Sequence, residues 1–155
     1  MEVVILQDRP QIGRVAADAV AGLLNRKPDA VLGLATGSSP LMIYDELAAR
    51  YEAGELSFRQ ARGFTLDEYV GLPADHPERY RNVIDAVLVS RVDFADGAVQ
   101  GPDGLAADIP ASCAAYEAAI RDAGGVDLQI LGIGTDGHIA FNEPGSSLGS
   151  RTRLK

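Results

Sequence analysis

The most chemically distinctive part of the chain is the stretch from Asp127 to Ser147, DLQILGIGTDGHIAFNEPGSS. It begins with a short apolar run that is typical of a strand covered on both faces in a parallel sheet. Glycines then surround Asp136 and His138 where that strand should end, and glycine permits positive φ and close approach of the backbone to a ligand. Because open α/β sheets bind ligands at the carboxyl ends of their strands, the pattern predicts a site here.

Three ionisable side chains share this strand exit, namely Asp136, His138 and Glu143. Asp136 and His138 are two residues apart, so in an extended segment their side chains leave on the same side. A carboxylate beside an imidazole fixes its tautomer and raises its pKa, as proton transfer near neutral pH requires. An ordinary Asp-Gly-His turn followed by a surface acid is the alternative. Three ionisable groups on one glycine-rich exit favour the proton-transfer site.

A second candidate is the polar loop that follows an apolar run from Ala30 to Ala35. Gly37, Ser38 and Ser39 separate that predicted strand from a helix that starts at Pro40 and runs to about Ala53. The free N–H groups and positive dipole end of such a helix favour an anion, for example a sugar phosphate. Simple helix capping by one of the two serines is an equally good interpretation. The chain has no GxGxxG or GxxxxGK[ST] fingerprint for nucleotides.

The third candidate is a pair of carboxylates, Asp67 and Glu68, where the predicted strand from Phe64 to Leu66 ends. Consecutive residues of a strand point in opposite directions. One carboxylate is therefore expected to face the site while the other turns away. Taken alone, such a pair is more often a solvated strand end.

The strands and helices that must position these groups are predicted from the periodicity of apolar residues and from the glycines and prolines between the periodic segments. Strands are predicted at 3–6, 30–35, 64–66, 98–100 and 127–132, and helices at 10–24, 40–53, 77–91 and 110–123. Helices and strands alternate throughout. The alternation predicts a predominantly parallel, doubly wound sheet with both glycine loops and Asp67 at one edge.

The segment GIGTDGHIAFNEPGSS, followed by LGSRTRLK, resembles the signature of the glucosamine-6-phosphate deaminases. LGLATGSSP and FTLDEYVGL resemble that family's other two motifs and occur in the expected order, so the resemblance runs over essentially the whole chain. It implies a three-layer, doubly wound, Rossmann-like sheet with helices on both faces. It also implies that residues 1–155 form a single sugar-phosphate isomerase/deaminase domain that lacks the C-terminal part of the family fold.

The activity implied by the resemblance is conversion of glucosamine 6-phosphate to fructose 6-phosphate and ammonia in amino sugar catabolism, by an enzyme of hydrolase or isomerase type. By resemblance, Asp67 is the base that carries a proton between C2 and C1. By the same resemblance His138 serves ring opening, and Asp136 and Glu143 orient and tune its imidazole. These acid–base steps require no cofactor and no metal.

The resemblance also assigns phosphate binding to Gly37, Ser38 and Ser39. Some family members carry an allosteric phosphate site, and its motif positions are matched near the end of the chain, where a basic surface tail is the alternative. The matching residues are Ser146, Arg153 and Lys155. Further phosphate-binding cations of the family lie beyond the position that matches Lys155, so we expect little activity from the chain taken alone.

Composition narrows the class of protein. The 155 residues are 46% hydrophobic and 23% charged, which is typical of a folded globular chain. A net charge of −8 argues against general nucleic-acid binding. Cys113 is the only cysteine, in a helical pattern that favours burial, and no segment approaches membrane-spanning length. With no basic leader before the first predicted strand, we expect a cytoplasmic protein; homo-oligomer formation is left open.

Three rival functions remain open. The related 6-phosphogluconolactonases share a Gly-x-Asp-Gly-His core, but IAFNEPGSS and LDEY follow the deaminase pattern. A non-catalytic sugar-phosphate sensor would not need the full set of proton-transfer groups. A metal site is the third, since carboxylates and imidazole suit several divalent ions, but it is the least favoured. Its candidate ligands are Asp136, His138 and Glu143; the only other histidine, His76, is predicted to lie in a loop with Asp75 and Glu78.

Overall fold

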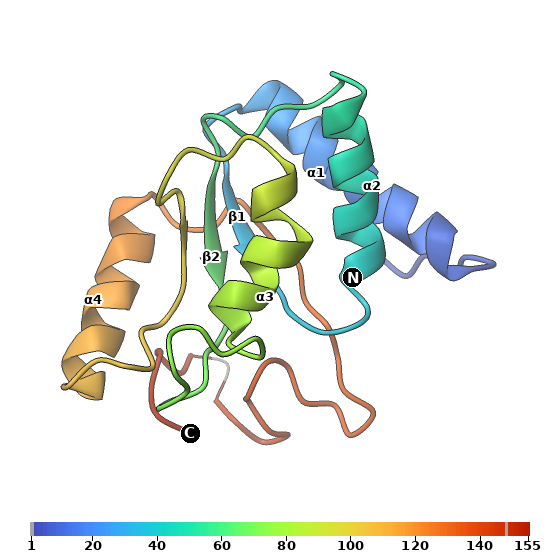
Figure 1. The fold of residues 1–155 in the computed structure, drawn as a ribbon. Coiled ribbons are helices and arrows are strands. Elements are labelled where there is room, and N and C mark those ends of the chain that lie inside the picture. Colours follow the sequence, from blue (N-terminus) through green and yellow to red (C-terminus); the bar gives the residue numbers. More distant parts are fainter. Residues whose placement is uncertain (1, 148) are drawn as a thin grey trace.

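A parallel sheet of four strands lies at the centre of the computed structural model, which describes residues 2–147 and 149–155 (Figure 1). The strand order is β3-β2-β1-β4. The strands are β1 (Val31–Leu34), β2 (Arg62–Thr65), β3 (Val99–Gln100) and β4 (Leu128–Gln129). All neighbouring strands are parallel, so the predicted sheet type is confirmed.

Helices cover both faces of the sheet, as predicted (Figure 1). On one face lie α1 (Arg9–Arg26), α2 (Leu41–Glu52) and α3 (Tyr80–Val87), the last followed by the 3-10 turn η1 (Val89–Arg91). On the other face lies α4 (Ile109–Asp122). Asp8 and Asp108 cap α1 and α4 by accepting N–H groups of the first turn, each just before a proline near the helix start.

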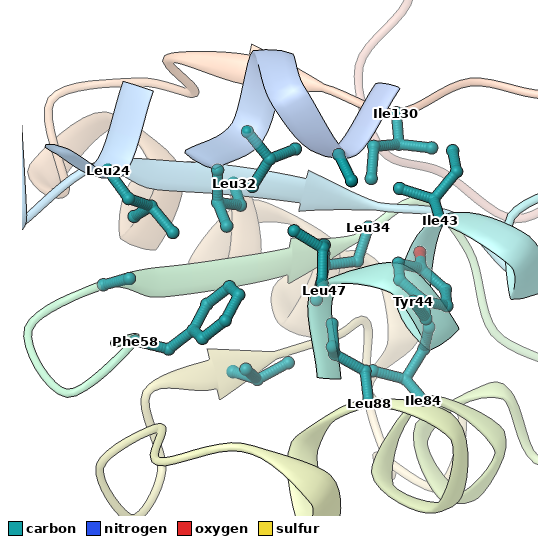
Figure 2. Packing of buried hydrophobic residues seen from close by; sticks show 14 of the residues in the cluster. Leu24, Leu32, Leu34, Ile43, Tyr44, Leu47, Phe58, Ile84, Leu88 and Ile130 are labelled. Atoms are coloured by element: carbon teal, nitrogen blue, oxygen red, sulfur yellow. The ribbon is translucent and has the colours of Figure 1, made fainter. Parts of the chain in front are cut away.

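The main core lies between the sheet and the three helices of its first face (Figure 2). Figure 2 shows Leu32 and Leu34 of β1 facing side chains of α2, with Phe58 nearby. A smaller cluster on the opposite face packs Tyr116 of α4 against Val31 and Phe64. Both faces of β1 are therefore buried, which explains its apolar sequence, VLGL. In β2 the residues from Gly63 to Thr65 are buried as well.

The predicted strand from Val3 to Leu6 is wrong. The segment forms no strand in the structure, and the Ile5 side chain is 91% exposed. An apolar segment becomes a strand only beside a hydrogen-bonding partner, and among the described residues none lies next to it. β4 is likewise shorter than predicted, because its pairing with β1 ends near Ile130 and Ile133 is 76% exposed.

The topology creates a crevice between β1 and β4. From β1 the chain passes through α2 to β2, which lies beside β1, and through α3 to β3 at that edge of the sheet. It then crosses the opposite face through α4 and reaches β4, which pairs with the other edge of β1. Ligands of open α/β sheets bind where the strand order reverses in this way, outside the carboxyl ends of the strands. Within the described ranges, no helix has the length and apolar character needed to cross a bilayer.

Candidate functional site

A cavity of about 330 Å³ opens at the carboxyl ends of β1, β2 and β4. It brings together side chains from all three candidate segments, which lie far apart in the sequence. Its wall includes Thr36, Gly37, Ser38, Ser39, Asp67, Tyr80, Gly132, Gly134, His138 and Phe141. In Figure 1 the arrowheads of β1 and β2 point toward the loops that form it. The prediction that these segments share one edge of the sheet is confirmed.

The loop after β1 presents free backbone donors to this cavity. Gly37 has a φ of 104°, a backbone conformation that residues with a side chain rarely adopt, and it turns the chain toward α2. Within the described part of the chain, no hydrogen bond occupies the N–H groups of Gly37, Ser38 and Ser39. The helix N-cap is Pro40, and no side chain caps it, so the alternative that a serine merely caps α2 is wrong. The free donors suit an anion.

Tyr44 of α2 fixes the residue from which this loop departs. Its hydroxyl accepts the N–H of Ala35 at 3.0 Å and donates to the carbonyl oxygen of Ala35 at 2.7 Å, and both groups are buried. Burial raises the pKa of Tyr44 well above its ordinary value, so the hydroxyl keeps its proton. No sequence signal identified this residue, because one hydroxyl satisfying both groups of a strand end is a tertiary contact.

Asp67 lies half-buried at the end of β2, in the wall of the cavity. Burial, and then the negative charge of Glu68, raise the pKa of Asp67 to about 6. The end of β2 is held from the other face of the sheet, where the Tyr116 hydroxyl donates to the Thr65 carbonyl oxygen at 2.5 Å. A fixed carboxyl group that titrates near pH 6 is suited to accept a proton at neutral pH.

Asp136 and His138 form the predicted carboxylate–imidazole pair. His138 Nδ1 lies 2.7 Å from Asp136 Oδ1, which also accepts the His138 backbone N–H at 3.3 Å. These contacts, the backbone one first, hold the pKa of Asp136 below its ordinary value. The two side chains meet across a tight turn at Gly137, where φ is 93°, rather than along an extended strand. A proton on Nδ1 leaves Nε2 as the free nitrogen of the ring.

The imidazole ring of His138 packs directly against the backbone of Gly134. A Cβ atom built there would lie 2.3 Å from His138 Cε1 and 2.4 Å from Nδ1. We therefore expect Gly134→Ala to displace the ring from Asp136 and to lower turnover by about tenfold or more, as misplaced catalytic groups do. The measurement is ammonia release in the complemented assay described below. Gly22→Ala in α1, where the added methyl meets only an arginine side-chain end at 3.4 Å, is the control expected to keep activity.

Glu143 does not join the other two ionisable groups. In the described ranges no hydrogen bond links its side chain to Asp136 or His138. The chain reverses before it, with Ala140 at a φ of 53° and a bridge between Ile139 and Asn142. Glu143 instead lines a second cavity, of about 720 Å³, on the other side of Asp67.

Basic residues near the end of the chain lie in the wall of the larger cavity. Arg153 and Lys155 line it; the first donates to Asn142 Oδ1 at 3.0 Å, and the second reaches Ser146 Oγ at 3.3 Å. Glu117 of α4 anchors the same segment by accepting the backbone N–H and the hydroxyl of Thr152. The three residues matched to an allosteric site are therefore close together, next to the site of Asp67.

Three aromatic rings that lie close together line the two cavities: Tyr69 lines the larger one, Tyr80 the smaller one and Phe141 both. Tyr69 lies with its ring centroid 4.9 Å from that of Tyr80 and 5.4 Å from that of Phe141, and the latter two are 5.8 Å apart. Burial and the neighbouring Tyr69 hydroxyl raise the pKa of Tyr80. Neither Tyr80 nor Phe141 was predicted as a site residue, although Phe141 lies within the motif GIGTDGHIAFNEPGSS.

His76, the other histidine, lies in a local turn. The Nδ1 atom of His76 accepts the Glu78 backbone N–H at 3.2 Å. Among residues 2–147 and 149–155, no group of three His, Cys, Asp or Glu side chains is arranged to hold a metal ion. Cys113 is half-buried in the wall of the larger cavity.

A 3-2-1-4 parallel sheet with its cavity at the carboxyl edge, lined by a hydroxyl-rich helix start and acid–base groups, defines a Rossmann-like class of ligand-binding α/β proteins. The chain belongs to the family described as glucosamine-6-phosphate isomerases/6-phosphogluconolactonase, which matches residues 10–150. The predicted family is thereby confirmed. This description names isomerases, so hydrolase was an imprecise label for the expected reaction.

Individual relatives favour the deaminase branch of the family. Over 155 residues, the chain is 82% identical to a glucosamine-6-phosphate deaminase of Mycolicibacterium smegmatis and 57% identical to one of Streptomyces coelicolor. It spans 59% of the length of each.

Solved structures also favour the deaminase branch over the lactonase branch. A monomeric glucosamine-6-phosphate deaminase superposes with a TM-score of 0.95 at 39% identity, over 99% of this chain and 64% of that one. A 6-phosphogluconolactonase of Thermotoga maritima reaches a TM-score of 0.76 at 30% identity, over 89% of this chain and 62% of that one. The lactonase alternative is therefore less supported than the deaminase one.

Proposed function

We propose that the chain supplies the catalytic loops of a glucosamine-6-phosphate deaminase, which converts glucosamine 6-phosphate and water to fructose 6-phosphate and ammonia. One observation carries the proposal. A half-buried carboxyl group with a pKa of about 6, Asp67, shares one cavity with a carboxylate–imidazole pair and a loop of free N–H donors. Acid–base groups and an anion subsite together are what isomerisation of a sugar phosphate requires.

The proposed chemistry uses the two acid–base groups in turn. His138, held by Asp136, takes the proton of the C1 hydroxyl and returns one to the ring oxygen, which opens the pyranose. Asp67 then removes the C2 proton and delivers it to C1, while the C2 amino group loses a proton and the C1 oxygen gains one. C1 thereby becomes a primary alcohol and C2 an imine carbon. Water adds to that carbon, ammonia leaves, and a ketone remains at C2. Glu143 is kept as a proposed participant in ring opening on the resemblance alone.

The phosphate is proposed to bind at the start of α2. Three consecutive residues, Gly37, Ser38 and Ser39, offer N–H groups and two exposed hydroxyls beside the positive end of a 12-residue helix. Such a set provides several donors without a lysine or arginine. Affinity should be modest in this chain, because charge-assisted contacts are the stronger ones.

Full activity is proposed to need the part of the relatives that this chain does not span. The chain spans 59% of the Mycolicibacterium smegmatis enzyme. Exposed apolar residues occur at the end of β4, at Leu131 and Ile133, and in the N-terminal segment around Ile5. Apolar surface of this kind is commonly covered by further chain.

The decisive experiment measures ammonia release from glucosamine 6-phosphate by the purified chain, alone and mixed with a fragment covering the remaining length of the Mycolicibacterium smegmatis enzyme. We expect turnover only in the mixture. Turnover by the chain alone at the rate of the intact relative would contradict the need for the missing part. If the mixture hydrolyses 6-phosphogluconolactone but releases no ammonia, the deaminase proposal fails. Ammonia release that survives a chelator would also argue against a metal mechanism.

Three lesser proposals rest on the resemblance and on composition. Ser146, Arg153 and Lys155 are proposed as a second anion site. Arg153 and Lys155 line the larger cavity, and the contact between Lys155 and Ser146 supports the proposal. The cytoplasm is the proposed location, since a single cysteine suits a reducing compartment. Assembly into a homo-oligomer also stays a prediction.

A further inference from the structure

Glu68, the residue after Asp67, is the most completely buried carboxylate next to the site. Its side chain is only 2% exposed. Oε1 accepts the backbone N–H groups of Tyr69 at 2.9 Å and Tyr80 at 3.0 Å, and Oε2 accepts that of Arg81 at 3.0 Å. Neither the deaminase motif nor the reaction steps above give this side chain a role.

The contacts make Glu68 the cap of α3 from a distance in sequence. The first N–H groups of any helix lack partners within the helix. In α3 the N-cap residue, Arg79, makes no side-chain capping bond, and the carboxylate of Glu68 takes its place. A negative charge there also faces the positive end of the helix dipole. This cap explains why α3 begins at Tyr80 rather than at the predicted Pro77.

The nearest cation contributes less than these N–H groups. The Nε atom of Arg79 lies 3.9 Å from Glu68 Oε2, too far for a hydrogen bond, and it is buried without a partner among the described residues. The three backbone donors therefore account for most of the favourable contacts of the buried charge.

We propose that Glu68 is a positioning residue for the reaction, fixing Asp67 and Tyr80 in the wall of one cavity. Glu68 is bonded to Asp67 through the backbone and to Tyr80 through the N–H contact, and both of these residues line the cavity. One buried side chain thereby sets the end of β2 against the start of α3. The inference rests on the proposed role of Asp67 as the base.

The charge of Glu68 has a second consequence for Asp67. Burial is the larger cause of the raised pKa of Asp67, and Glu68 is the second. The other titratable groups around Asp67 are the hydroxyls of Tyr80 and Tyr116 and the imidazole of His138. Charged groups on the larger-cavity side are Asp103, Glu117, Glu143, Arg151, Arg153 and Lys155. Glu68 thus helps to keep Asp67 basic enough to accept a proton.

The test replaces Glu68 by Gln in the 155-residue chain and follows the Asp67 carboxyl carbon by NMR while the pH is varied. Gln keeps the size of the side chain but loses the charge and one acceptor. We expect the Asp67 pKa in E68Q to fall below about 6 and to stay above 3.8, because burial remains. We also expect faster hydrogen exchange at the N–H of Arg81 than in the unmodified chain. Neither readout depends on deaminase activity, so each tests Glu68 even if the proposed function fails.

The matched control is Asp93→Asn. Asp93 is also a largely buried carboxylate that accepts a backbone N–H, from Phe58 at 2.6 Å, together with the Ser57 hydroxyl. Asp93 follows η1 in the chain, and its partners Ser57 and Phe58 precede β2, at the opposite end of that strand from Asp67. D93N should lower stability without moving the Asp67 titration or the Arg81 exchange rate.

Two results would overturn the inference. One is an Asp67 titration in folded E68Q that matches the unmodified chain; the other is unchanged exchange at Arg81. If E68Q does not fold, Glu68→Asp provides the test. Its charge remains near Asp67 while its reach is one methylene shorter, so we expect the Asp67 titration to stay near pH 6 and Arg81 exchange to rise. Slow exchange at Arg81 in E68D would likewise contradict the capping role.

Discussion

Replacing Asp67 by Asn is expected to lower ammonia release by about 10²–10⁴-fold, the usual contribution of a positioned acid–base group. Asn has nearly the same shape as Asp but cannot accept the C2 proton. The cavity wall and the loop after β1 should be unchanged, since neither depends on the charge of Asp67. The assay is the complemented mixture with glucosamine 6-phosphate, in which the unmodified chain sets the reference rate.

Binding separates a catalytic role of Asp67 from a structural one. Calorimetric titration of glucosamine 6-phosphate into the mixture should give a similar affinity for D67N and for the unmodified chain. A loss of affinity as large as the loss of rate would mean that Asp67 serves binding rather than proton transfer. Full activity of D67N would leave the deaminase mechanism without its base.

Although D67N should lose activity, it should gain stability at neutral pH. The Asp67 pKa is raised from 3.8 to about 6 in the folded chain, so the folded state holds the proton more tightly than the unfolded state does. The unmodified chain therefore loses stability as the pH rises from 3.8 to 6, and the loss persists above pH 6. D67N should be about 1–2 kcal/mol more stable at pH 7, after allowance for the solvent contact of this half-buried group. That advantage should disappear at pH 3.5 in urea unfolding measured at both pH values.

The sequence was sufficient to predict the parts of the site that are local. Gly37 and Pro40 indicated the start of α2, and the Asp-Gly-His spacing indicated the carboxylate–imidazole pair. The alternation of helices and strands placed these loops and Asp67 at one edge. Each of these inferences depends on residues within a few positions of one another, or on a topological rule that holds for most parallel sheets.

The parts that could not be predicted depend on long-range contacts. Glu68 was expected only to turn away from the site; its role as the cap of α3 joins residues 12 positions apart. Glu143 follows His138 closely, but the reversal at Ala140 sends it to the other cavity. The apolar run near Ile5 has the pattern of a strand, but a pattern cannot show whether a neighbouring strand exists.

Two tyrosines from opposite faces of the sheet hold the strand ends that carry the site. Tyr44 of α2 binds both backbone groups of Ala35 after β1, and Tyr116 of α4 binds the carbonyl oxygen of Thr65 in β2. The residues that follow these two positions are the anion-binding candidates and Asp67. The helix layers therefore do more than cover the sheet, because their hydroxyls fix where its functional loops begin.

Tyr44→Phe should accordingly produce the largest stability loss among changes of a single oxygen atom. Removal of the Tyr44 hydroxyl leaves the buried N–H and the buried carbonyl oxygen of Ala35 without their partner. An unsatisfied buried group costs about 1–3 kcal/mol. We expect the free energy of unfolding, measured in urea, to fall by about 1–3 kcal/mol.

Tyr51→Phe is the matched control for this change, since Tyr51 is on the same helix and its hydroxyl makes no hydrogen bond within the described residues. Y51F should change stability by less than about 0.5 kcal/mol. Because Ala35 precedes the loop of Gly37 to Ser39, Y44F should also weaken binding of inorganic phosphate while Y51F does not. Equal stability of the two variants would mean that Ala35 finds other partners; equal phosphate binding would mean that the position of the loop does not depend on the end of β1.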